Sequence, residues 1–499
     1  MIDLLKHPPS SYINGRFEPI PGDDLVSTDP TEPDRIIWQG SPSVDHVDEA
    51  IQAARRALDE WSARPMNDRA DMLRRWQQIV ALHAERIAEV ITDEMGKTLA
   101  EARLEAKGLA DKVRITLDEI SLSRVREYEV SVSASRAGHC RFKPHGVMAV
   151  LGPFNFPAHL PNGHFVPALL LGNTVVFKPS KQTPAVGQLL GELMDEAGVP
   201  PGVFNMIHGG RGVAPRLVTH DGIDGILFTG SWAVGRSILE ANLDRPGRIM
   251  ALEMGGNNPA VVLADAHLKQ AVLECARAAF ATTGQRCTCT RRVIVEQDIA
   301  QRFIPALCKV TSTLLIGPPR STDPIFMGPV VSEQAVQDVR RFQDDLVQAG
   351  GRVLVEATAM DRPGHFVTPG VVEVEGFSVQ TDCEVFGPFL QVTVVSDLDQ
   401  AIDQANATKY GLAASIFTND DAAYETFFRR VRAGCINRNT GTAGASSKLP
   451  FGGLGHSGNH RPAAAFSVDY CAYPVANMVE QSSDAAVPSG MLWDDSWTS

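Results

Sequence analysis

The sequence feature that most constrains the fold is an alternation of short apolar runs with helix-like segments between residues 147 and 254. Each run is rich in β-branched or apolar residues and is followed by turn residues and then by a helical pattern. Strands that alternate with helices form mostly parallel sheets with helices on both faces. We therefore predict a doubly wound α/β unit, with strands at residues 147–151, 174–177, 203–207, 226–228 and 249–252.

The same alternation restarts at residue 256, with apolar runs at 261–263, 292–295 and 391–395, and predicts a second α/β unit. The segment 125–142 differs, because apolar and polar residues alternate there as in a half-exposed strand or hairpin arm. An exposed strand edge of that length invites aggregation. We therefore predict that this arm and the apolar stretch 466–475 pair across the subunit interface of a homodimer or homotetramer.

Two amphipathic helices are predicted near the N-terminus. The first spans residues 44–61, with Ser43 as the candidate N-cap. The second spans residues 67–95 and stops at Gly96, because glycine suits the left-handed turn after a helix. The run Gly96-Lys97-Thr98 looks like the end of a phosphate-binding loop, but that motif needs a glycine at position 91, where this chain has isoleucine. No phosphate loop is predicted.

Charge and cysteine content exclude several classes of protein. The chain has 499 residues and a formal net charge of −13, so a nucleic-acid-binding surface is not expected. Its eight cysteines lack the paired spacing of a disulfide scaffold, and residues 1–9 lack the apolar core of a signal peptide. Residues 144–177 contain no Asp, Glu, Lys or Arg, but their prolines, asparagines and histidines exclude a membrane span. We predict a cytoplasmic protein with reduced thiols.

The most informative segment for function is Gly284-Gln285-Arg286-Cys287-Thr288-Cys289. Small residues bring backbone N–H groups close to a cysteine, and we expect Arg286 to favour the thiolate that attacks carbonyls. The alternative is that Cys287 and Cys289 are merely small buried residues. Taken alone, this segment does not distinguish a nucleophile from a small buried cysteine, and the latter is the more common role.

Two further segments supply groups that a nucleophilic cysteine needs. Glu253 closes an apolar strand and precedes two glycines, at the strand end where α/β sheets collect ligands, so it is a candidate general base. Asn155 lies between prolines and aromatic residues, and its fixed amide is a candidate oxyanion donor. Taken singly, a strand-end salt bridge and a turn cap are the more common roles of such residues.

Together, these segments resemble the NAD(P)-dependent aldehyde dehydrogenase superfamily over nearly the whole chain. The glutamate and cysteine motifs are separated by the spacing expected of that family, and further matches lie at 177–180, 228–231, 384–388 and 450–453. The resemblance implies that Cys287 adds to an aldehyde and that Asn155 and the Cys287 N–H hold the oxyanion. It also implies that Glu253 activates the water that hydrolyses the thioester.

The resemblance further implies NAD as cofactor, with NADP as an alternative. The implied cofactor residues are Lys178 at the adenine ribose, Gly230 and Ser231 at the pyrophosphate with Gly235 in the same segment, and Glu384 and Phe386 at the nicotinamide ribose. NAD-dependent members commonly carry a glutamate three residues after the ribose-binding lysine. This chain has Lys181 there, so we expect NAD as the working cofactor with measurable NADP use.

Within the superfamily, residues 145–147, 156–164, 254–259, 284–289 and 457–462 resemble the succinylglutamate semialdehyde dehydrogenases of arginine degradation. Such an aldehyde carries several carboxylates, so the acidic chain must supply local donors. The candidates are His159, Arg286, Arg438, Ser446, Ser447 and Lys448. The alternatives are a dehydrogenase of another carboxylate-bearing semialdehyde, a thiol-dependent esterase or acyl transferase, and a non-catalytic binding protein. The joint presence of Cys287, Glu253 and Asn155 disfavours the last.

Two literal motif matches are set aside. Residues 453–458 fit GxGxxG but follow a turn instead of a strand, so we expect a structural turn beside the active site. His159 and His164 lack the glutamate of a zinc helix, and no metal site is predicted.

The predicted domains are a Rossmann-like NAD-binding domain at 1–122 and 145–254, a catalytic domain at 255–445 and an oligomerisation arm at 123–144 and 463–485.

Overall fold

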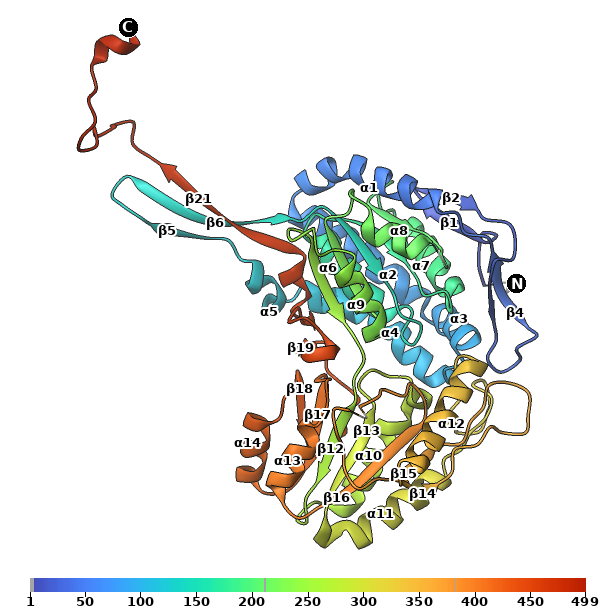
Figure 1. The fold of residues 1–499 in the computed structure, drawn as a ribbon. Helices are drawn as coiled ribbons and strands as arrows, with labels where there is room; N and C mark the ends of the chain where they lie inside the picture. The colour runs from blue at the N-terminus through green and yellow to red at the C-terminus, as the bar shows by residue number, and fades with distance from the viewer. Residues whose placement is uncertain (1–3, 211, 381) are drawn as a thin grey trace.

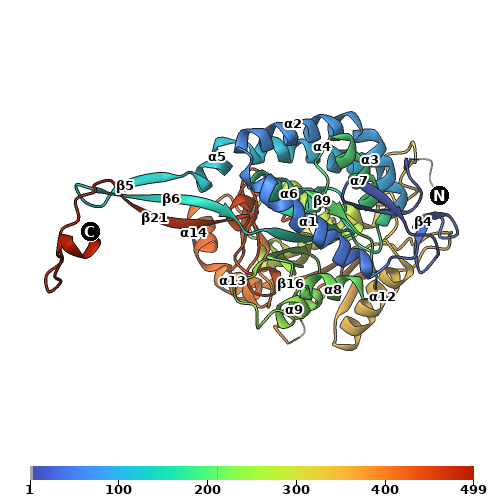
Figure 2. The ribbon, with the colours of Figure 1, turned by 90° about the horizontal axis from the view of Figure 1, so that it is seen from above.

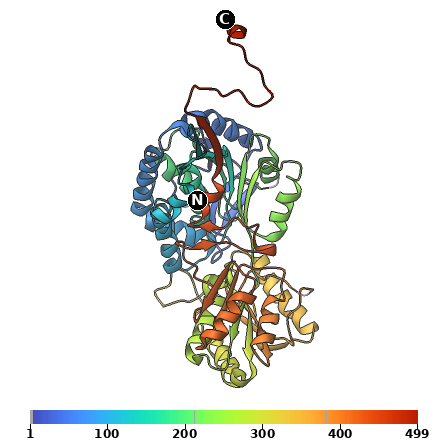
Figure 3. The same ribbon diagram turned by 90° about the vertical axis from the view of Figure 1, so that its left-hand side faces the viewer.

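The computed structural model describes residues 4–210, 212–380 and 382–499. Residues 1–3, which belong to the N-terminal segment 1–9 and to the first predicted domain, lie outside the described residues. Two α/β units lie one above the other (Figures 1 and 3). The chain builds the first unit, then the second, and finally returns to the first. A long arm leaves the first unit and carries the C-terminus.

The first unit is built around a seven-stranded sheet in the order β11-β10-β7-β8-β9-β1-β2. Its strands β11 to β9 are parallel, and β1 and β2 add an antiparallel edge. Parallel pairing requires long crossovers between strands, which the predicted helices supply. The strands are β1 (Ser10–Ile13), β2 (Arg16–Pro19), β7 (Val147–Leu151), β8 (Thr174–Lys178), β9 (Phe204–Met206), β10 (Gly225–Thr229) and β11 (Ile249–Glu253).

Helices cover both faces of this sheet, because successive side chains of a strand point to opposite sides. Val147 and Ala149 of β7 pack in a core with α1, α8 and α9, whereas Met148 and Val150 pack in a second core with α2, α4 and α6. A separate hairpin is formed by β3 (Leu25–Thr28) and β4 (Ile36–Gly40). The helices are α1 (Asp45–Ala63), α2 (Met66–Leu82), α3 (Ala84–Met95), α4 (Leu99–Thr116), α5 (Glu119–Leu122), η1 (Ser123–Val125), α6 (His159–Leu170), α7 (Pro184–Glu196), α8 (Val213–Thr219) and α9 (Trp232–Glu240).

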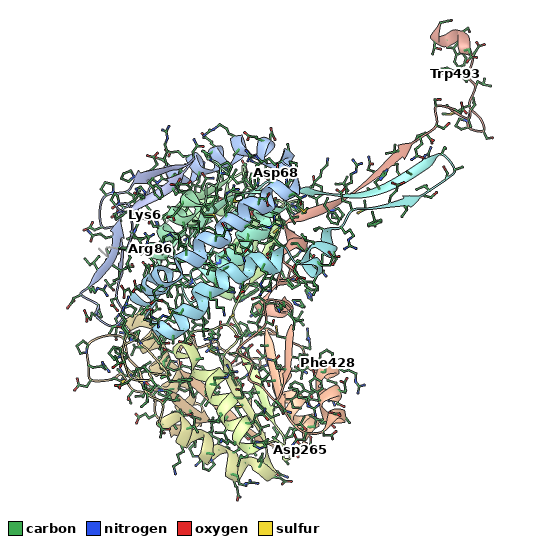
Figure 4. The ribbon with its side chains drawn as sticks, turned by 180° about the vertical axis from the view of Figure 1, so that it is seen from behind. Lys6, Asp68, Arg86, Asp265, Phe428 and Trp493 are labelled. Atoms are coloured by element: carbon green, nitrogen blue, oxygen red, sulfur yellow. The ribbon has the colours of Figure 1, made fainter. Side chains whose placement is uncertain are left out.

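The N-terminal segment is tied to the first unit through α7. The Lys6 N–H and the Arg86 guanidinium both donate to the Glu192 carboxylate, at 2.9 and 2.7 Å (Figure 4). This shared carboxylate fixes the start of the described chain beside α3.

The second unit repeats the architecture, with the strand order β14-β15-β16-β13-β12-β17-β18. Ala260 and Val262 of β12 pack with α10 and α11, whereas Val261 packs with α13 and α14 on the other face. The doubly wound α/β fold predicted from the sequence is confirmed. The elements are β12 (Asn258–Val262), α10 (Leu268–Phe280), η2 (Ala281–Gly284), β13 (Thr290–Glu296), α11 (Gln297–Ser312), α12 (Glu333–Gln348), β14 (Arg352–Val355), β15 (Gly370–Glu373), β16 (Phe389–Val395), α13 (Leu398–Asn406), β17 (Ala413–Phe417), α14 (Asp421–Arg430) and β18 (Cys435–Arg438).

The arm is a three-stranded antiparallel sheet in the order β21-β6-β5 that projects from the body (Figure 2). The two segments are partners within one chain, and their pairing across a subunit interface stays a prediction. Strand β21 pairs with β6 of the same chain along its whole length, because the returning chain reaches the base of β6. Figure 4 shows Trp493 beyond the tip of the arm. The strands of the arm are β5 (Tyr128–Ser131), β6 (Arg136–Pro144) and β21 (Ala472–Glu480). The other elements of the returning chain are β19 (Pro450–Phe451), η3 (Gly455–Ser457), β20 (Ala463–Ala464), η4 (Ser467–Tyr470) and η5 (Asp495–Thr498).

Two helix predictions need correction. The predicted single helix at 67–95 is broken at His83, which has φ −97° and ψ 16°, and becomes α2 and α3. Gly96 ends α3 with φ +77°, in the predicted left-handed conformation. The N-cap of α1 is Val44 and not Ser43, although the Ser43 Oγ accepts a hydrogen bond from the Asp45 N–H at 3.1 Å.

The apolar stretch 144–177 contains β7, α6 and most of β8, and most of the residues of these elements are buried. Across the described ranges, no helix combines the length and the apolar character that a membrane span needs. All eight cysteines lie within these ranges, and each is a free thiol.

Candidate active site

The two sheets meet at opposite strand ends. From the first sheet come carboxyl ends, where β8 ends at Lys178, β10 at Thr229 and β11 at Glu253. From the second sheet come amino ends, with Cys287 just before β13 and Glu384 just before β16. Because open α/β sheets bind ligands beyond the carboxyl ends of their strands, the loops of the second unit cover the ligand-binding edge of the first.

A cavity of about 210 Å³ lies at this boundary and is lined by both Cys287 and Glu253. Cys289 does not line it. Its side chain is fully buried, and its Sγ lies 3.9 Å from the carbonyl oxygen of Ala281. The sequence left open whether either cysteine meets a ligand, and the structure distinguishes them by placing only Cys287 of this pair against the cavity.

The Cys287 loop is held through its backbone carbonyls. Asn258 Nδ2 donates to the carbonyl oxygens of Cys287 and Cys289, at 2.8 Å each. The Arg291 guanidinium donates to three further carbonyls of the surrounding loops. The Cys287 N–H makes no hydrogen bond within the part of the chain that the structure describes. A fixed loop with one uncommitted N–H is suited to binding an anionic oxygen.

Burial raises the pKa of the Cys287 thiol, and the carboxyl groups of Glu384 and Glu253 raise it further. The cation that acts in the opposite direction is Arg291. Formation of the thiolate therefore needs either a cationic group bound nearby, which would lower the pKa of Cys287, or a neighbouring base that accepts the proton of the thiol.

Arg286 is engaged elsewhere, so the expectation that it favours the Cys287 thiolate is wrong. Its guanidinium pairs with Glu101 at 2.9 Å and donates to the Thr282 Oγ at 2.8 Å. Thr282 and Thr283 both adopt left-handed backbone conformations, with φ of +54° and +55°. Such conformations cost non-glycine residues about 1–2 kcal/mol each, so the contacts to Glu101 help to hold a strained turn before the cysteine.

Glu253 presents an unsatisfied oxygen. Its Oε2 is buried and has no hydrogen-bond partner among the described residues, and burial raises its pKa well above that of an ordinary glutamate. The predicted structural turn closes over it, because Gly458 forms an antiparallel bridge with Glu253 and a Cβ at Gly452 would lie 2.8 Å from Oε1. A desolvated carboxyl with a free oxygen is suited to accepting a proton near neutral pH.

Asn155 reaches the cysteine loop from the first unit, and its Nδ2 donates to the Gln285 carbonyl at 2.9 Å. Its own carbonyl accepts from Lys97 Nζ at 2.8 Å. Lys97 also forms a fully buried ion pair with Glu105 at 2.5 Å, and Glu105 accepts from the Ala158 N–H at 3.0 Å. The lysine of the rejected phosphate-loop match is therefore an anchor of the Asn155 loop.

The six predicted substrate donors divide into two groups. Arg438 pairs with Asp421 at 2.5 Å on the outside of the second unit, and Lys448 is exposed. Neither lines the cavity, so these two predictions are wrong. The four that line it are His159, Arg286, Ser446 and Ser447.

This arrangement of thiol, carboxyl and amide groups lies inside a chain segment that matches one family model. Residues 21–474 match the model of the aldehyde dehydrogenase family. The chain belongs to this family. The family resemblance predicted from the sequence is confirmed, and members of the family use NAD(P).

Relatives and solved structures agree with the family. An N-succinylglutamate 5-semialdehyde dehydrogenase of Caulobacter sp. (strain K31) is 44% identical over 93% of this chain and 95% of that protein. One from Novosphingobium aromaticivorans is 40% identical over 94% of this chain and 99% of that protein. Among solved structures, an NADP-dependent enzyme of E. coli has a TM-score of 0.90 at 30% identity, with coverage of 96% of this chain and 99% of that one.

An NADP-dependent glyceraldehyde-3-phosphate dehydrogenase from Bacillus halodurans C-125, complexed with NADP, has a TM-score of 0.89 at 29% identity, with coverage of 96% of this chain and 100% of that one.

In the chain described here, the carboxyl-end edge of the first sheet carries groups that fit a dinucleotide. Lys178 Nζ is buried and donates to the Pro179 carbonyl at 2.7 Å, and its pKa is lowered to about 8 by burial and by Lys181. Ser231 caps the N-terminus of α9. Among the described residues Lys178 forms no ion pair with a carboxylate, and an ammonium and a helix N-terminus at the same sheet edge both suit a phosphate-bearing ligand.

The remaining cofactor candidates have specific neighbours. Gly230 follows β10, whereas Gly235 is buried in α9, where a Cβ would lie 2.3 Å from the Met254 sulfur. Gly235 therefore permits close packing of α9. Glu384 accepts from the Gly256 N–H at 2.9 Å. Phe386 packs edge-on against Phe154, with ring centroids 5.6 Å apart.

Sequence reasoning missed several residues of this site. Arg291 and the Lys97–Glu105 pair organise the loops, and Lys112 of α4 lines the cavity. The signal for Lys112 was present, because it lies three residues after Leu109 and four before Thr116, on the buried stripe of α4. A lysine on an apolar helical stripe needs an explanation.

Proposed function

We propose that this chain oxidises N-succinylglutamate 5-semialdehyde to N-succinylglutamate with NAD(P), as a step of arginine degradation. The observation that carries the proposal is the convergence of Cys287, the unsatisfied Glu253 oxygen and the Asn155 loop at one boundary between the units. The choice of substrate is supported by relatives that bear this name at 40–44% identity over 93–94% of the chain.

The proposed reaction starts with addition of the Cys287 sulfur to the aldehyde carbon. After the thiol has lost its proton, a C–S bond forms and the carbonyl π pair moves to oxygen. The donors proposed for this oxyanion are the uncommitted Cys287 N–H and the Asn155 amide. Donors that are already fixed stabilise the new charge without reorganisation.

The chemistry supplied by bound NAD(P)⁺ is acceptance of the hydride from the former aldehyde carbon, which leaves a thioester on Cys287. The residues proposed to hold the dinucleotide are Lys178, Lys181, Gly230, Ser231, Glu384 and Phe386. Gly235 is proposed to act indirectly, by permitting α9 to lie close to this edge.

Hydrolysis of the thioester is the step that needs a base. In the proposal, the free oxygen of Glu253 takes a proton from water while the water oxygen bonds to the thioester carbon. The C–S bond then breaks, the carboxylic acid leaves and Cys287 is regenerated as thiolate. The raised pKa of Glu253 matches a group that must take up and release one proton in each turnover.

We also propose how the chain is divided and assembled. Residues 1–122 and 145–254 form the cofactor domain, 255–445 the catalytic domain, and 123–144 with 463–485 an arm through which copies form a homodimer or homotetramer. The outer edges of the arm support this, because Tyr128, Val130 and Met478 are exposed there. Eight free thiols support a cytoplasmic location.

The proposal is tested with purified protein, the semialdehyde and either NAD or NADP. Formation of reduced nicotinamide together with N-succinylglutamate is expected. A thiol-dependent esterase would instead cleave an activated ester without reducing either cofactor with any aldehyde. That result would overturn the proposed activity.

A further inference from the structure

Lys112 is a buried lysine that lines the cavity of Cys287 and takes no part in the proposed reaction steps. It lies on α4, is 2% exposed and lines the cavity together with Cys287 and Glu253. Lysine is almost never fully buried unless it is paired. Its environment therefore shows whether the charge serves the fold or a ligand.

The ammonium of Lys112 has only neutral protein partners. Its Nζ donates to the Ala464 carbonyl at 2.6 Å and to the Ser467 Oγ at 2.7 Å. No carboxylate forms an ion pair with it in residues 4–210, 212–380 or 382–499. An ammonium has three donor hydrogens, so two are used and one remains. Burial without an opposite charge lowers its pKa to about 7.

The neighbours of this ammonium belong to the cavity wall. Ala464 lines the cavity, and the His159 and His164 side chains, which also line it, both interact electrostatically with Lys112. The helix makes room for His159 at Gly108, where a Cβ would lie 2.8 Å from the His159 Nδ1. A glycine inside a helix is destabilising relative to alanine, and at this position it leaves room for the His159 side chain that lines the cavity.

The other cations near the cysteine are already compensated. Arg286 pairs with Glu101 at 2.9 Å. Arg291 lies 3.6 Å from Glu384 and donates to backbone carbonyls. Of the cationic side chains that line the cavity, Lys112 and Arg286, only Lys112 has no acidic partner in the described chain.

We propose that Lys112 binds a carboxylate of the aldehyde substrate and thereby selects carboxylate-bearing semialdehydes over uncharged aldehydes. The ammonium supplies the opposite charge and a donor hydrogen, while Ala464 and Ser467 hold it against the cavity wall. A charge-assisted hydrogen bond in a buried site is stronger than one between neutral groups. This inference rests on the proposed function and adds the residue that reads the charge of its substrate.

The test compares Lys112→Met with wild type on three aldehydes: N-succinylglutamate 5-semialdehyde, 5-oxopentanoate and pentanal. The wild type is expected to prefer 5-oxopentanoate to pentanal. In Lys112→Met, the ratio of kcat/KM for this matched pair should fall about 10- to 100-fold, mainly through KM of the charged aldehyde. The matched control is Lys107→Met, an exposed lysine on the same helix, which should keep the wild-type ratio.

A second variant separates charge from folding. Lys112→Gln removes the charge but keeps a donor for the Ala464 carbonyl, and it should lose the same preference if Lys112→Met is too unstable to assay. Product inhibition gives a second readout, because N-succinylglutamate should inhibit pentanal oxidation at least about 10-fold less well in either variant. An equal loss on 5-oxopentanoate and pentanal would show a structural role and overturn the inference.

The two proposals fail separately. If the wild type prefers 5-oxopentanoate but does not oxidise N-succinylglutamate 5-semialdehyde, the proposed substrate is wrong while the role of Lys112 is still decided by the matched pair. If the wild type oxidises the semialdehyde and the Lys112 variants keep the full preference for charge, only the inference about Lys112 is wrong.

Discussion

Two buried regions meet at the Asn155 loop: an anchor region around Lys97 and the cavity lined by Cys287. Charged groups have partners of opposite charge in the first region, whereas Glu253 and Lys112 in the second lack them among the described residues. In the anchor region, the Lys97 ammonium is fully compensated by the Glu105 carboxylate and by the Asn155 carbonyl. In the cavity, the Glu253 Oε2 has no hydrogen-bond partner and Lys112 no opposite charge among the described residues. Because an uncompensated buried group is costly, the difference indicates that the anchor region serves stability and the cavity serves chemistry.

A pair of glutamates shows the same contrast. Burial raises the pKa of both Glu94 and Glu253, to about 8 in the case of Glu94. However, Glu94 accepts hydrogen bonds from the Ser27 hydroxyl at 2.6 Å and from the Ala185 and Val186 N–H groups at 2.8 and 2.9 Å. It caps α7. Burial alone therefore does not identify a reactive carboxyl, whereas an empty hydrogen-bonding position does.

The largest expected effect comes from removing the nucleophile of the cavity. Cys287→Ala should lower aldehyde oxidation by about 10⁴-fold or more, because no other group supplies the covalent intermediate. Thermal stability and cofactor binding should change little. The matched control is Cys289→Ala, two residues away and outside the cavity, which should retain turnover. Undiminished oxidation by Cys287→Ala would contradict the assignment.

In the anchor region, Lys97→Met should act on stability. The variant leaves Glu105 as an unpaired buried charge, a change that costs about 3–5 kcal/mol. Denaturant unfolding monitored by tryptophan fluorescence measures this loss, with the exposed Lys107→Met as control. A loss of less than about 1 kcal/mol would show that the two regions do not differ as described.

Glu253→Gln should spare folding and slow hydrolysis. Rapid mixing is expected to show a burst of reduced cofactor followed by a steady rate about 100- to 1000-fold below wild type. Only the carboxylate form accepts a proton, so the wild-type steady rate should rise as pH passes upward through the raised pKa of Glu253, and this rise should vanish in the variant. Glu94→Gln is the control, which should lose stability without producing a burst. Normal steady turnover of Glu253→Gln would sink the role of base.

The smallest effect is expected at the exposed end of the cofactor edge. Lys181→Glu should lower kcat/KM with NADP relative to NAD by about two- to fivefold, since contacts of exposed charges are weak. Lys181 is exposed but acts electrostatically on Lys178, so its charge reaches the proposed ribose site. Lys269→Glu on the second unit changes the net charge equally and should leave the ratio alone. An unchanged ratio in Lys181→Glu would show that this lysine does not influence cofactor choice.

Local patterns in the sequence were sufficient for the main strands and for the reactive groups. The apolar run at 147–151 coincides with β7. All five residues of this strand are buried because helices cover both faces of a parallel sheet, and the alternation of strands and helices already predicts those helices. The motifs around Cys287 and Glu253 were recognisable because close packing forces particular residue types. A Cβ at Gly256 would lie 2.7 Å from the Cys287 carbonyl oxygen. Such constraints act over a few residues and are visible in a single chain.

Contacts between distant segments were decided only by the tertiary structure. Strand β21 of the arm pairs with β6 of its own chain. Its partner and register depend on where the returning chain reaches the arm, and the alternation of apolar and polar residues does not specify them. Arg286 was expected to act on the cysteine beside it, yet it pairs with Glu101, 185 residues away.

The sequence by itself determined two doubly wound units, the positions of most of their central strands and the family of the site, because periodicity and short motifs are local properties. Only the tertiary structure decided which buried charges have partners. Lys97 meets its carboxylate eight residues away, whereas the partners of Lys112 include Ser467, 355 residues away. The electrostatic energy of a buried group depends on every segment packed around it, and that environment exists only after the chain has folded.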